Sequence, residues 1–330
     1  MKPRLLVLEL WGLGDLVIAT PFLRAATKHF DVTLVAKPFA RELHPRLWPD
    51  VKVENFTAPW TAFHGKYQLW RWPWREMLQL RRRLVAQKFD CAVSARWDPR
   101  DHLVLKSSGA TERLGYARLK SQHYLTRVLP RPPALVHRYE HWREVGHALG
   151  LKLPAREKII PLQRPQQSGA LIHSGARLPA RIWPLENFQH IAARLREKNF
   201  AVQIACDPDQ VAWWQAHGEA PACPRTVSEL LSHIDRAGIF IGNCSGPGHL
   251  AAICGVPTYT LYGPSMHEWF MPLHPQAEIF EGHACPYKPC SDYCQFEKPF
   301  CLHDVTAEEV WPHVERFAAK HLAARAAVSA

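Results

Sequence analysis

The chain has 330 residues, which is too long for a single domain with one ordinary hydrophobic core. This length suits two domains of roughly 150 residues each. It has nine cysteines, but the first apolar stretch is too short for a secretion signal or a membrane span of about 20 residues, so we expect a cytoplasmic protein. The net charge is +11, yet the sequence shows no zinc-finger spacing, RNP-like strand or basic heptad helix, and we expect no nucleic-acid partner.

The first half of the sequence alternates short β-rich runs with longer helical ones. Strands are predicted over 5–10, 32–35, 51–56 and 91–94, and helices over 21–30 and 73–87. This alternation is typical of a parallel sheet covered by helices on both faces. We predict an N-terminal acceptor-binding domain over 1–155, followed by a Pro-, Gln- and Arg-rich linker over 156–168.

The alternation then resumes. Strands are predicted over 170–173, 201–205, 239–241 and 258–262, with helices over 185–198 and 228–237. The sequence therefore predicts an α/β protein with two doubly wound domains, the second over 169–312, and a helical tail over 313–330. Ligands of such sheets bind where strands end, which directs attention to the loops after Leu10, His173, Ile241 and Tyr262.

The loop after the first strand contains Gly12, Gly14 and Asp15. Its glycines allow a tight turn and leave space beside Asp15 for a ligand. Asp15 could simply cap the following helix by accepting backbone N–H bonds. Alternatively it is a general base that takes a proton from an acceptor hydroxyl, kept ionised by the helix terminus.

Two loops of the second half suit a phosphate-bearing ligand. One combines a small-residue turn with arginines, whose planar charged groups suit a diphosphate, although a solvated basic loop is the alternative. The other leads directly into an apolar helix, so its N–H groups would form an anion site at a helix N-terminus, although a plain turn is the alternative. The candidate donor-binding residues are His173, Ser174, Gly175, Arg177, Arg181, Cys244, Ser245, Gly246, Pro247 and His249.

Three motifs, taken in order, resemble the ADP-heptose:lipopolysaccharide heptosyltransferase family, glycosyltransferase family 9. They are Gly-Asp-Leu at 14–16, His-Ser-Gly…Arg-x-Trp-Pro at 173–184, and Ser-Gly-Pro-x-His-Leu-Ala-Ala…Tyr-Gly-Pro at 245–264. The resemblance implies the GT-B fold, in which two Rossmann-like domains face a central cleft. It also implies inverting transfer without a metal or other cofactor, from a nucleotide-diphosphate sugar such as ADP-heptose to lipopolysaccharide core or a related envelope glycan.

By position in these motifs, Asp15 matches the family's catalytic base and Arg181 a residue that contacts the donor phosphates. Ser245, Gly246 and His249 fall in the donor loop. One departure is Cys244, which stands where the family commonly has Asp and leaves the donor sugar open. The alternative function is therefore a degenerate GT-B protein that binds nucleotide or anionic glycan without catalysis.

A cysteine cluster and a basic segment remain outside these motifs. The cysteine-rich insert 285–301 carries four thiols that could hold a structural zinc ion, stay free or partly oxidised, or form an iron–sulfur cluster or disulfides. They are Cys285, Cys290, Cys294 and Cys301.

Residues 66–131 hold 15 Lys or Arg against five Asp or Glu. Within them, Trp74, Met77, Leu78, Leu84 and Val85 recur at helical intervals and predict a helix with an apolar stripe and a basic back. That back is either a solvated face or a surface that docks, with tryptophans at the interface, on anionic lipid or on an anionic glycolipid acceptor at the inner face of the membrane. The arginines of this predicted patch are Arg71, Arg75, Arg81, Arg82 and Arg83.

Overall fold

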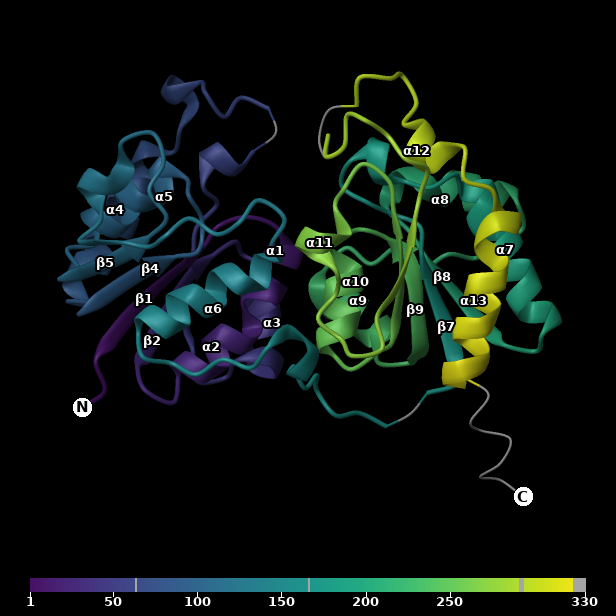
Figure 1. The fold of residues 1–330 in the computed structure, drawn as a ribbon, viewed down its shortest axis with the longest axis horizontal. Helices are drawn as coiled ribbons and strands as arrows, with labels where there is room; N and C mark the ends of the chain where they lie inside the picture. Colours follow the sequence, from purple (N-terminus) through teal and green to yellow (C-terminus); the bar gives the residue numbers. More distant parts are fainter. Residues whose placement is uncertain (63, 166, 291–293, 323–330) are drawn as a thin grey trace. The chain divides into compact units, whose positions relative to one another are not determined.

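The computed structural model describes residues 1–62, 64–165, 167–290 and 294–322. The chain divides into two compact units, Met1–Ala155 and Arg156–Ala330 (Figure 1). Each unit is one parallel sheet with helices on both faces. A short 3₁₀ helix, Arg156–Lys158, lies in the predicted linker, of which residue 166 falls outside the described residues. Among the described helices, none is both long and apolar enough to cross a membrane.

The first unit contains a six-stranded sheet in the order β3-β2-β1-β4-β5-β6, and all of its pairings are parallel. Strands β5 and β6 were not predicted, because they are short and partly polar and therefore lack an apolar run. The strands are β1 Arg4–Glu9, β2 Asp31–Ala36, β3 Lys52–Asn55, β4 Cys91–Ser94, β5 Glu112–Gly115 and β6 Arg127–Val128.

Helices cover both faces of this sheet because β1 is apolar on both sides. Leu6 and Leu8 share one core cluster with Leu80 and Leu84, whereas helices α1, α2 and α6 pack together. The helices are α1 Leu13–Ile18, α2 Thr20–Ala26, α3 Ala40–Leu47, α4 Trp74–Ala86, α5 Pro99–Ser107 and α6 Arg138–Ala148. Short 3₁₀ helices span Pro59–Thr61, Leu69–Arg71 and Ser121–Tyr124.

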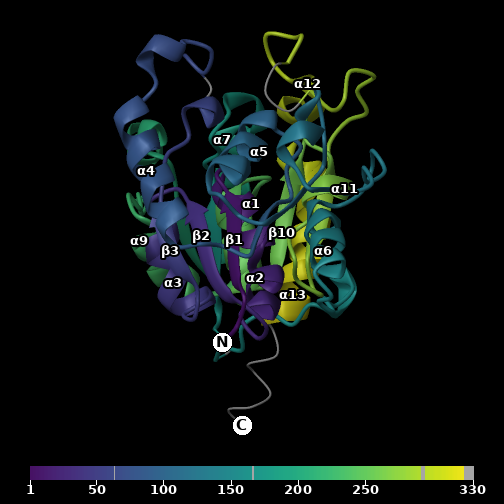
Figure 2. The ribbon, with the colours of Figure 1, turned by 90° about the vertical axis from the view of Figure 1, so that its left-hand side faces the viewer.

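The strand order reverses between β1 and β4. Figure 2 shows β1, β2 and β3 side by side, and the chain then crosses to the other side of β1 to form β4. The loops that follow β1 and β4 therefore leave the sheet in opposite directions and open a crevice at its carboxyl edge. In doubly wound sheets this topological switch point is where ligands bind.

The second unit contains a five-stranded parallel sheet in the order β11-β10-β9-β7-β8. Its order reverses between β7 and β9, so the loops after these two strands form its switch point. Strand β11, which was not predicted, is an edge strand with two glutamates. The strands are β7 Gly169–His173, β8 Ala201–Ala205, β9 Ala237–Asn243, β10 Thr258–Tyr262 and β11 Glu278–Glu281.

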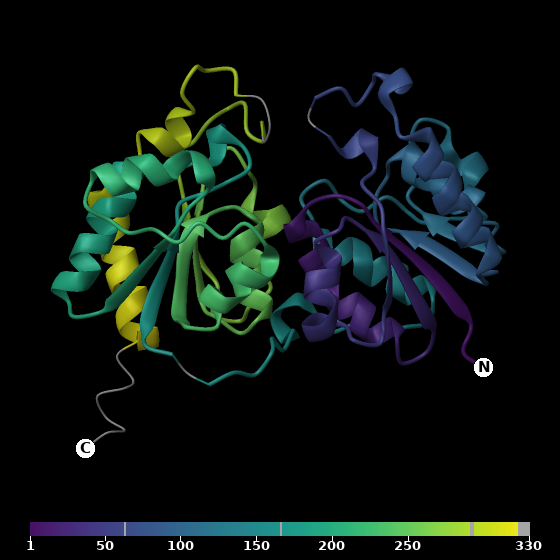
Figure 3. The same ribbon diagram turned by 180° about the vertical axis from the view of Figure 1, so that it is seen from behind.

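Helices α7 and α13 lie side by side over one face of this sheet (Figures 1 and 3), and α9 and α10 pack together with β9. The final helix begins before the predicted tail, and residues 323–330 of that tail fall outside the described residues. The helices are α7 Leu185–Glu197, α8 Val211–Ala216, α9 Val227–Ile234, α10 Gly246–Ile253, α11 His267–Phe270, α12 Phe300–His303 and α13 Ala307–Leu322. Short 3₁₀ helices span Pro179–Arg181 and Pro208–Gln210.

Candidate active site

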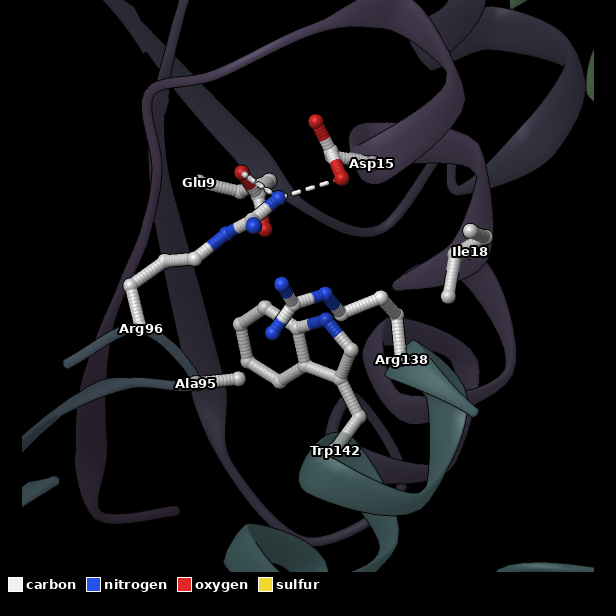
Figure 4. Close-up of a pocket in the computed structure, with 7 residues that line it drawn as sticks. All are labelled: Glu9, Asp15, Ile18, Ala95, Arg96, Arg138 and Trp142. Carbon is white, nitrogen blue, oxygen red and sulfur yellow. Dashed lines mark ion pairs between the residues drawn. The ribbon is translucent and has the colours of Figure 1, made fainter. Parts of the chain in front are cut away.

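Asp15 and Arg96 meet at the switch point of the first unit. Asp15 lies in the first turn of α1, and Arg96 lies in the loop after β4. The guanidinium group of Arg96 forms an ion pair with the Asp15 carboxylate (Figure 4). The backbone N–H of Gly12 donates a hydrogen bond to Oδ2 of Asp15 over 3.2 Å, so the carboxylate is also a local helix cap. Both the capping role and the ion pair fix its position.

A second carboxylate, Glu9, shares the same guanidinium. Nη2 of Arg96 lies 3.7 Å from Oε1 of Glu9, and the backbone N–H of Trp11 donates to that oxygen over 3.3 Å. The Trp11 ring also packs against Arg96, with 5.4 Å between the guanidinium carbon and the ring centre. Glu9 is only 2% exposed because it ends a buried strand. One cation thus bridges a buried and a partly exposed carboxylate.

The two carboxylates have opposite pKa shifts. Burial raises the pKa of Glu9 to about 7, although the charge of Arg96 acts against this shift. Burial would also raise the pKa of Asp15, but the charge and hydrogen bond of Arg96 outweigh it, so that pKa is lowered. At neutral pH Asp15 is ionised, and Arg96 rather than the helix terminus is the main reason.

A pocket lies beside this pair (Figure 4). Arg138, at the start of α6, brings a second cation to it, and burial together with the charge of Arg96 lowers the Arg138 pKa to about 10. The guanidinium groups of Arg138 and Arg131 lie 4.7 Å and 5.2 Å from the centre of the Trp97 ring. The pocket is lined by Glu9, Asp15, Ile18, Ala95, Arg96, Arg138 and Trp142.

The predicted site included Asp15 but missed Glu9, Arg96 and Arg138. One signal was available for Arg96, because it follows the predicted strand 91–94 at a strand end. That loop approaches Asp15 only because β4 pairs with β1, and the sequence pattern does not specify strand order. Glu9 had no signal apart from an acidic residue at the end of an apolar strand.

Asn243 organises the switch point of the second unit. Its Nδ2 donates to the carbonyl of Ser174 over 2.8 Å, and its Oδ1 accepts from the backbone N–H of Trp183 over 3.0 Å. It therefore joins the end of β9 to the loop after β7 and to the segment that leads into α7. Trp183, fully buried, donates from its indole to the carbonyl of Val305 over 2.8 Å. The Arg-x-Trp-Pro motif is anchored in the core through this side chain.

The side chains of His173 and Ser174, both predicted donor contacts, make hydrogen bonds that hold the loop. The Ser174 hydroxyl is fully buried, donates to Gln210 over 2.8 Å and accepts from the Trp214 indole over 3.1 Å. Nδ1 of His173 accepts from the backbone N–H of Gly175 over 3.2 Å. Burial lowers the pKa of His173, which keeps the ring neutral. The side chains in this loop that could reach a ligand are therefore those that follow Gly175.

Gly175 is buried, whereas the arginines after it reach the surface. A Cβ at Gly175 would come within 2.4 Å of the Asp207 carboxyl group, so the residue must be small there. Arg177 is exposed and Arg181 is half-buried. The charge of Arg181 acts on both Cys244 and Tyr262, which places it beside the loop after β9. Both predicted phosphate contacts are thus at least partly accessible in the loop after β7.

The loop after β9 ends at the N-terminus of α10. Ser245 occupies the position before the first helical residue, and its hydroxyl has no hydrogen-bond partner among the described residues. Gly246 and Pro247 form the first turn, and His249 is buried behind it at 5% exposed. The first-turn N–H groups of a helix are unpaired within the helix and attract anions. This end of α10 is the part of the unit best suited to a phosphate.

Cys244, the first residue of this loop, is buried beside β10. Burial raises the pKa of its thiol, although the charge of Arg181 acts against that shift. The thiol is therefore neutral at pH 7. Where the resembled family commonly has a carboxylate, this chain has an uncharged, buried group.

The predicted stripe on α4 is only partly correct. Its buried face consists of Leu80 and Leu84, because those two side chains point toward the sheet, whereas Trp74, Leu78 and Val85 are exposed. Four of the five predicted patch arginines, Arg71, Arg75, Arg81 and Arg82, are exposed and make no ion pair with a described carboxylate, whereas Arg83 pairs with Glu54 over 3.2 Å.

Structural zinc in the cysteine-rich insert is not supported. Cys285, Cys290, Cys294 and Cys301 are all free, and residues 291–293 between them fall outside the described residues. Across the described part of the chain, no group of three or more His, Cys, Asp or Glu side chains is arranged to hold a metal ion. Burial raises the pKa of Cys301 to about 11, which keeps that thiol neutral.

Solved glycosyltransferases share this fold. An ADP-heptose lipopolysaccharide heptosyltransferase II of Escherichia coli is 17% identical with a TM-score of 0.74, over 96% of this chain and 99% of that chain. A family 9 glycosyltransferase of Veillonella parvula is 18% identical with a TM-score of 0.78, over 97% and 98%. The fold is therefore GT-B, as predicted from the sequence.

The family follows from a sequence match. Residues 77–300 match glycosyltransferase family 9 (heptosyltransferase), and the chain belongs to this family. Lipopolysaccharide heptosyltransferase 3 of Escherichia coli K12 is 29% identical over 112 residues, which cover 31% of this chain and 33% of that relative. The resemblance inferred from the three motifs is thereby confirmed.

Proposed function

We propose that this protein is an inverting, metal-independent glycosyltransferase that moves a heptose from ADP-heptose to a hydroxyl of lipopolysaccharide core or a related envelope glycan. The observation that carries the proposal is the Asp15 carboxylate, ionised and held by Arg96 at the switch point of a doubly wound sheet. The family match supports the reaction class, and the names of the two heptosyltransferases of Escherichia coli support the sugar.

Asp15 acts on the acceptor. As the acceptor oxygen attacks the anomeric carbon, its proton becomes acidic and passes to Asp15, while the bond between that carbon and the diphosphate oxygen breaks. Attack opposite the leaving group inverts the configuration. Arg96 lowers the basicity of Asp15, but it also keeps the carboxylate ionised and aimed. Glu9 shares the same guanidinium and thereby weakens the hold of Arg96 on Asp15.

The second unit handles the leaving nucleoside diphosphate. Arg177 and Arg181 carry permanent charge, and the N-terminus of α10 with the Ser245 hydroxyl offers further donors. These groups are suited to stabilise the negative charge that develops on the diphosphate as the glycosidic bond breaks. Arginines and a helix terminus can supply this stabilisation without a divalent cation, which is the basis for proposing metal independence.

Replacement of Asp15 tests the mechanism. Asp15→Asn should lower turnover of ADP-heptose by roughly 10²- to 10⁴-fold, the range for loss of a general base, with nucleotide binding unchanged. A matched control is Asp31→Asn, whose carboxylate pairs with Lys52 on the surface and should leave turnover unchanged. Turnover by Asp15→Asn within threefold of the parent protein would contradict the assignment.

The alternative is a degenerate protein that binds nucleotide without transferring sugar, and the neutral Cys244 favours it. A thermal-shift screen against ADP-, GDP-, UDP- and CMP-linked sugars separates the two functions when combined with a turnover assay. Saturating ligand at 100 times its dissociation constant should stabilise the fold by about 2.7 kcal/mol. Selective stabilisation by ADP-heptose together with its turnover supports the transferase, whereas stabilisation with no turnover on any acceptor glycan supports the alternative.

A further inference from the structure

The outward side of α4 carries apolar side chains that are only partly covered by their own unit. Trp74, Leu78 and Val85 are spaced four and seven residues apart, so they lie along one side of the helix. They are 49%, 53% and 43% exposed, whereas Leu80 and Leu84 are buried. The helix therefore has two apolar faces, and the sheet covers only one.

The segment before α4 extends this apolar surface. Tyr67, Leu69 and Trp70 are 75%, 52% and 78% exposed. The Trp74 indole donates to the carbonyl of Leu69 over 2.9 Å, which fixes the short 3₁₀ helix Leu69–Arg71 against the start of α4. We call the five side chains at this end the Trp70 patch: Tyr67, Leu69, Trp70, Trp74 and Leu78.

Cations are interleaved with the patch. Residues 66–85 contain six Lys or Arg and one acidic residue, Glu76. The ammonium group of Lys66 lies 5.3 Å from the centre of the Tyr67 ring. The exposed arginines that make no ion pair with a described carboxylate are Arg71, Arg75, Arg81 and Arg82. Exposed aromatic and aliphatic side chains mixed with unneutralised cations are complementary to a surface that is both apolar and anionic.

We propose that the Trp70 patch docks this protein on an anionic lipid bilayer, with its aromatic side chains at the depth of the headgroups and its arginines on the lipid phosphates. Trp and Tyr favour that depth because one part of each ring system is apolar and the other polar, and arginines extend toward the phosphates. This inference rests on the proposed function in one respect, because a lipid-linked acceptor lies in such a bilayer. Docking there would hold the acceptor-binding unit at the surface that carries its substrate.

Vesicle co-sedimentation of the full chain tests the proposal without any donor or turnover. The parent protein should bind vesicles of phosphatidylglycerol mixed with phosphatidylcholine, and bind phosphatidylcholine alone much more weakly. Leu69→Ser with Trp70→Ser should weaken binding to the mixed vesicles by roughly tenfold, because two interfacial anchors are lost. Arg75→Gln with Arg82→Gln should remove most of the preference for anionic lipid.

The matched control is Leu119→Ser with Ile160→Ser, at 78% and 76% exposed, which lie outside the patch and should bind like the parent protein. Lack of vesicle binding by the parent protein would overturn the proposal, as would binding that the patch variants share unchanged. An oligomer that Leu69→Ser with Trp70→Ser dissolves, without vesicle binding, would instead assign the patch to a second copy. Turnover of a water-soluble acceptor should survive this pair of substitutions, so failure of docking and failure of transfer remain distinguishable.

Discussion

The ends of β1 and β4 in the first unit gather two carboxylates around an arginine, whereas the loops after β7 and β9 in the second carry arginines and small residues but no carboxylate. Both pairs of loops occupy a switch point of a doubly wound sheet. The first gathers Glu9, Asp15 and Arg96, and the second is joined by Asn243 and ends in Ser245 and a helix N-terminus. One topology thus yields a site suited to moving a proton and a site suited to holding a phosphate, because the loop residues differ.

The largest effect on stability is expected when the shared cation of the first switch point, Arg96, is removed. Arg96→Leu leaves Glu9 and Asp15 without their shared partner and should lower the free energy of unfolding by about 3 kcal/mol at pH 8. Urea titration measures this change. Arg143→Leu breaks a partly exposed pair with Glu140 on α6 and should cost less than about 1 kcal/mol. Equal losses of stability in the two variants would contradict the view that Arg96 contributes more to the fold than Arg143 does.

The pH dependence of stability tests Glu9. Its pKa is about 7 in the folded protein against an ordinary value of 4.5, so the native state binds the proton more tightly. Stability therefore falls as pH rises from about 4.5 to about 7. The lowered pKa of Asp15 acts in the opposite direction, but only below its ordinary 3.8.

Glu9→Gln lacks the titrating group, so it should gain about 2 to 3 kcal/mol relative to the parent protein between pH 5 and pH 8. Urea titrations of both proteins at the two pH values measure the gain. Glu112→Gln, at an exposed position, provides the control and should show no such gain. A pH-independent difference between Glu9→Gln and the parent protein would mean that Glu9 is ionised throughout this range.

A smaller effect is expected at the switch point of the second unit. Asn243→Leu leaves the buried backbone N–H of Trp183 without its acceptor and removes a donor from the carbonyl of Ser174. Stability should fall by about 2 kcal/mol, and affinity for ADP should fall with it because the loop is released. Asn187→Leu removes one of two hydrogen bonds to the carbonyl of Val305, and that carbonyl still accepts from the Trp183 indole. This variant should therefore lose less than half as much stability as Asn243→Leu. Calorimetry of both variants with ADP, combined with unfolding titrations, checks the ranking.

The two switch points also differ in how much of each could be predicted from the sequence. The second switch point was identifiable from sequence, because glycine, proline and serine after an apolar strand mark a turn into a helix. Asp15 was identifiable for the same reason, since it follows Gly12 and Gly14. Arg96 and Glu9 were not, because they become neighbours of Asp15 only through strand pairing. The hydrogen bonds of Ser174 could not be foreseen, because a strand-end hydroxyl can face either a ligand or the core.

Local sequence determined the alternation of strands and helices, the turn at each strand end, and the motifs that identify the family. These features depend on neighbouring residues and on side-chain periodicity, which a sequence displays directly. Tertiary structure alone decided which loops meet, which carboxylate is buried, and which face of α4 stays exposed. Leu80 and Trp74 are both apolar residues of one helix, yet one is buried and the other exposed. Burial and long-range pairing set these outcomes, and they arise only when segments distant in the chain pack together.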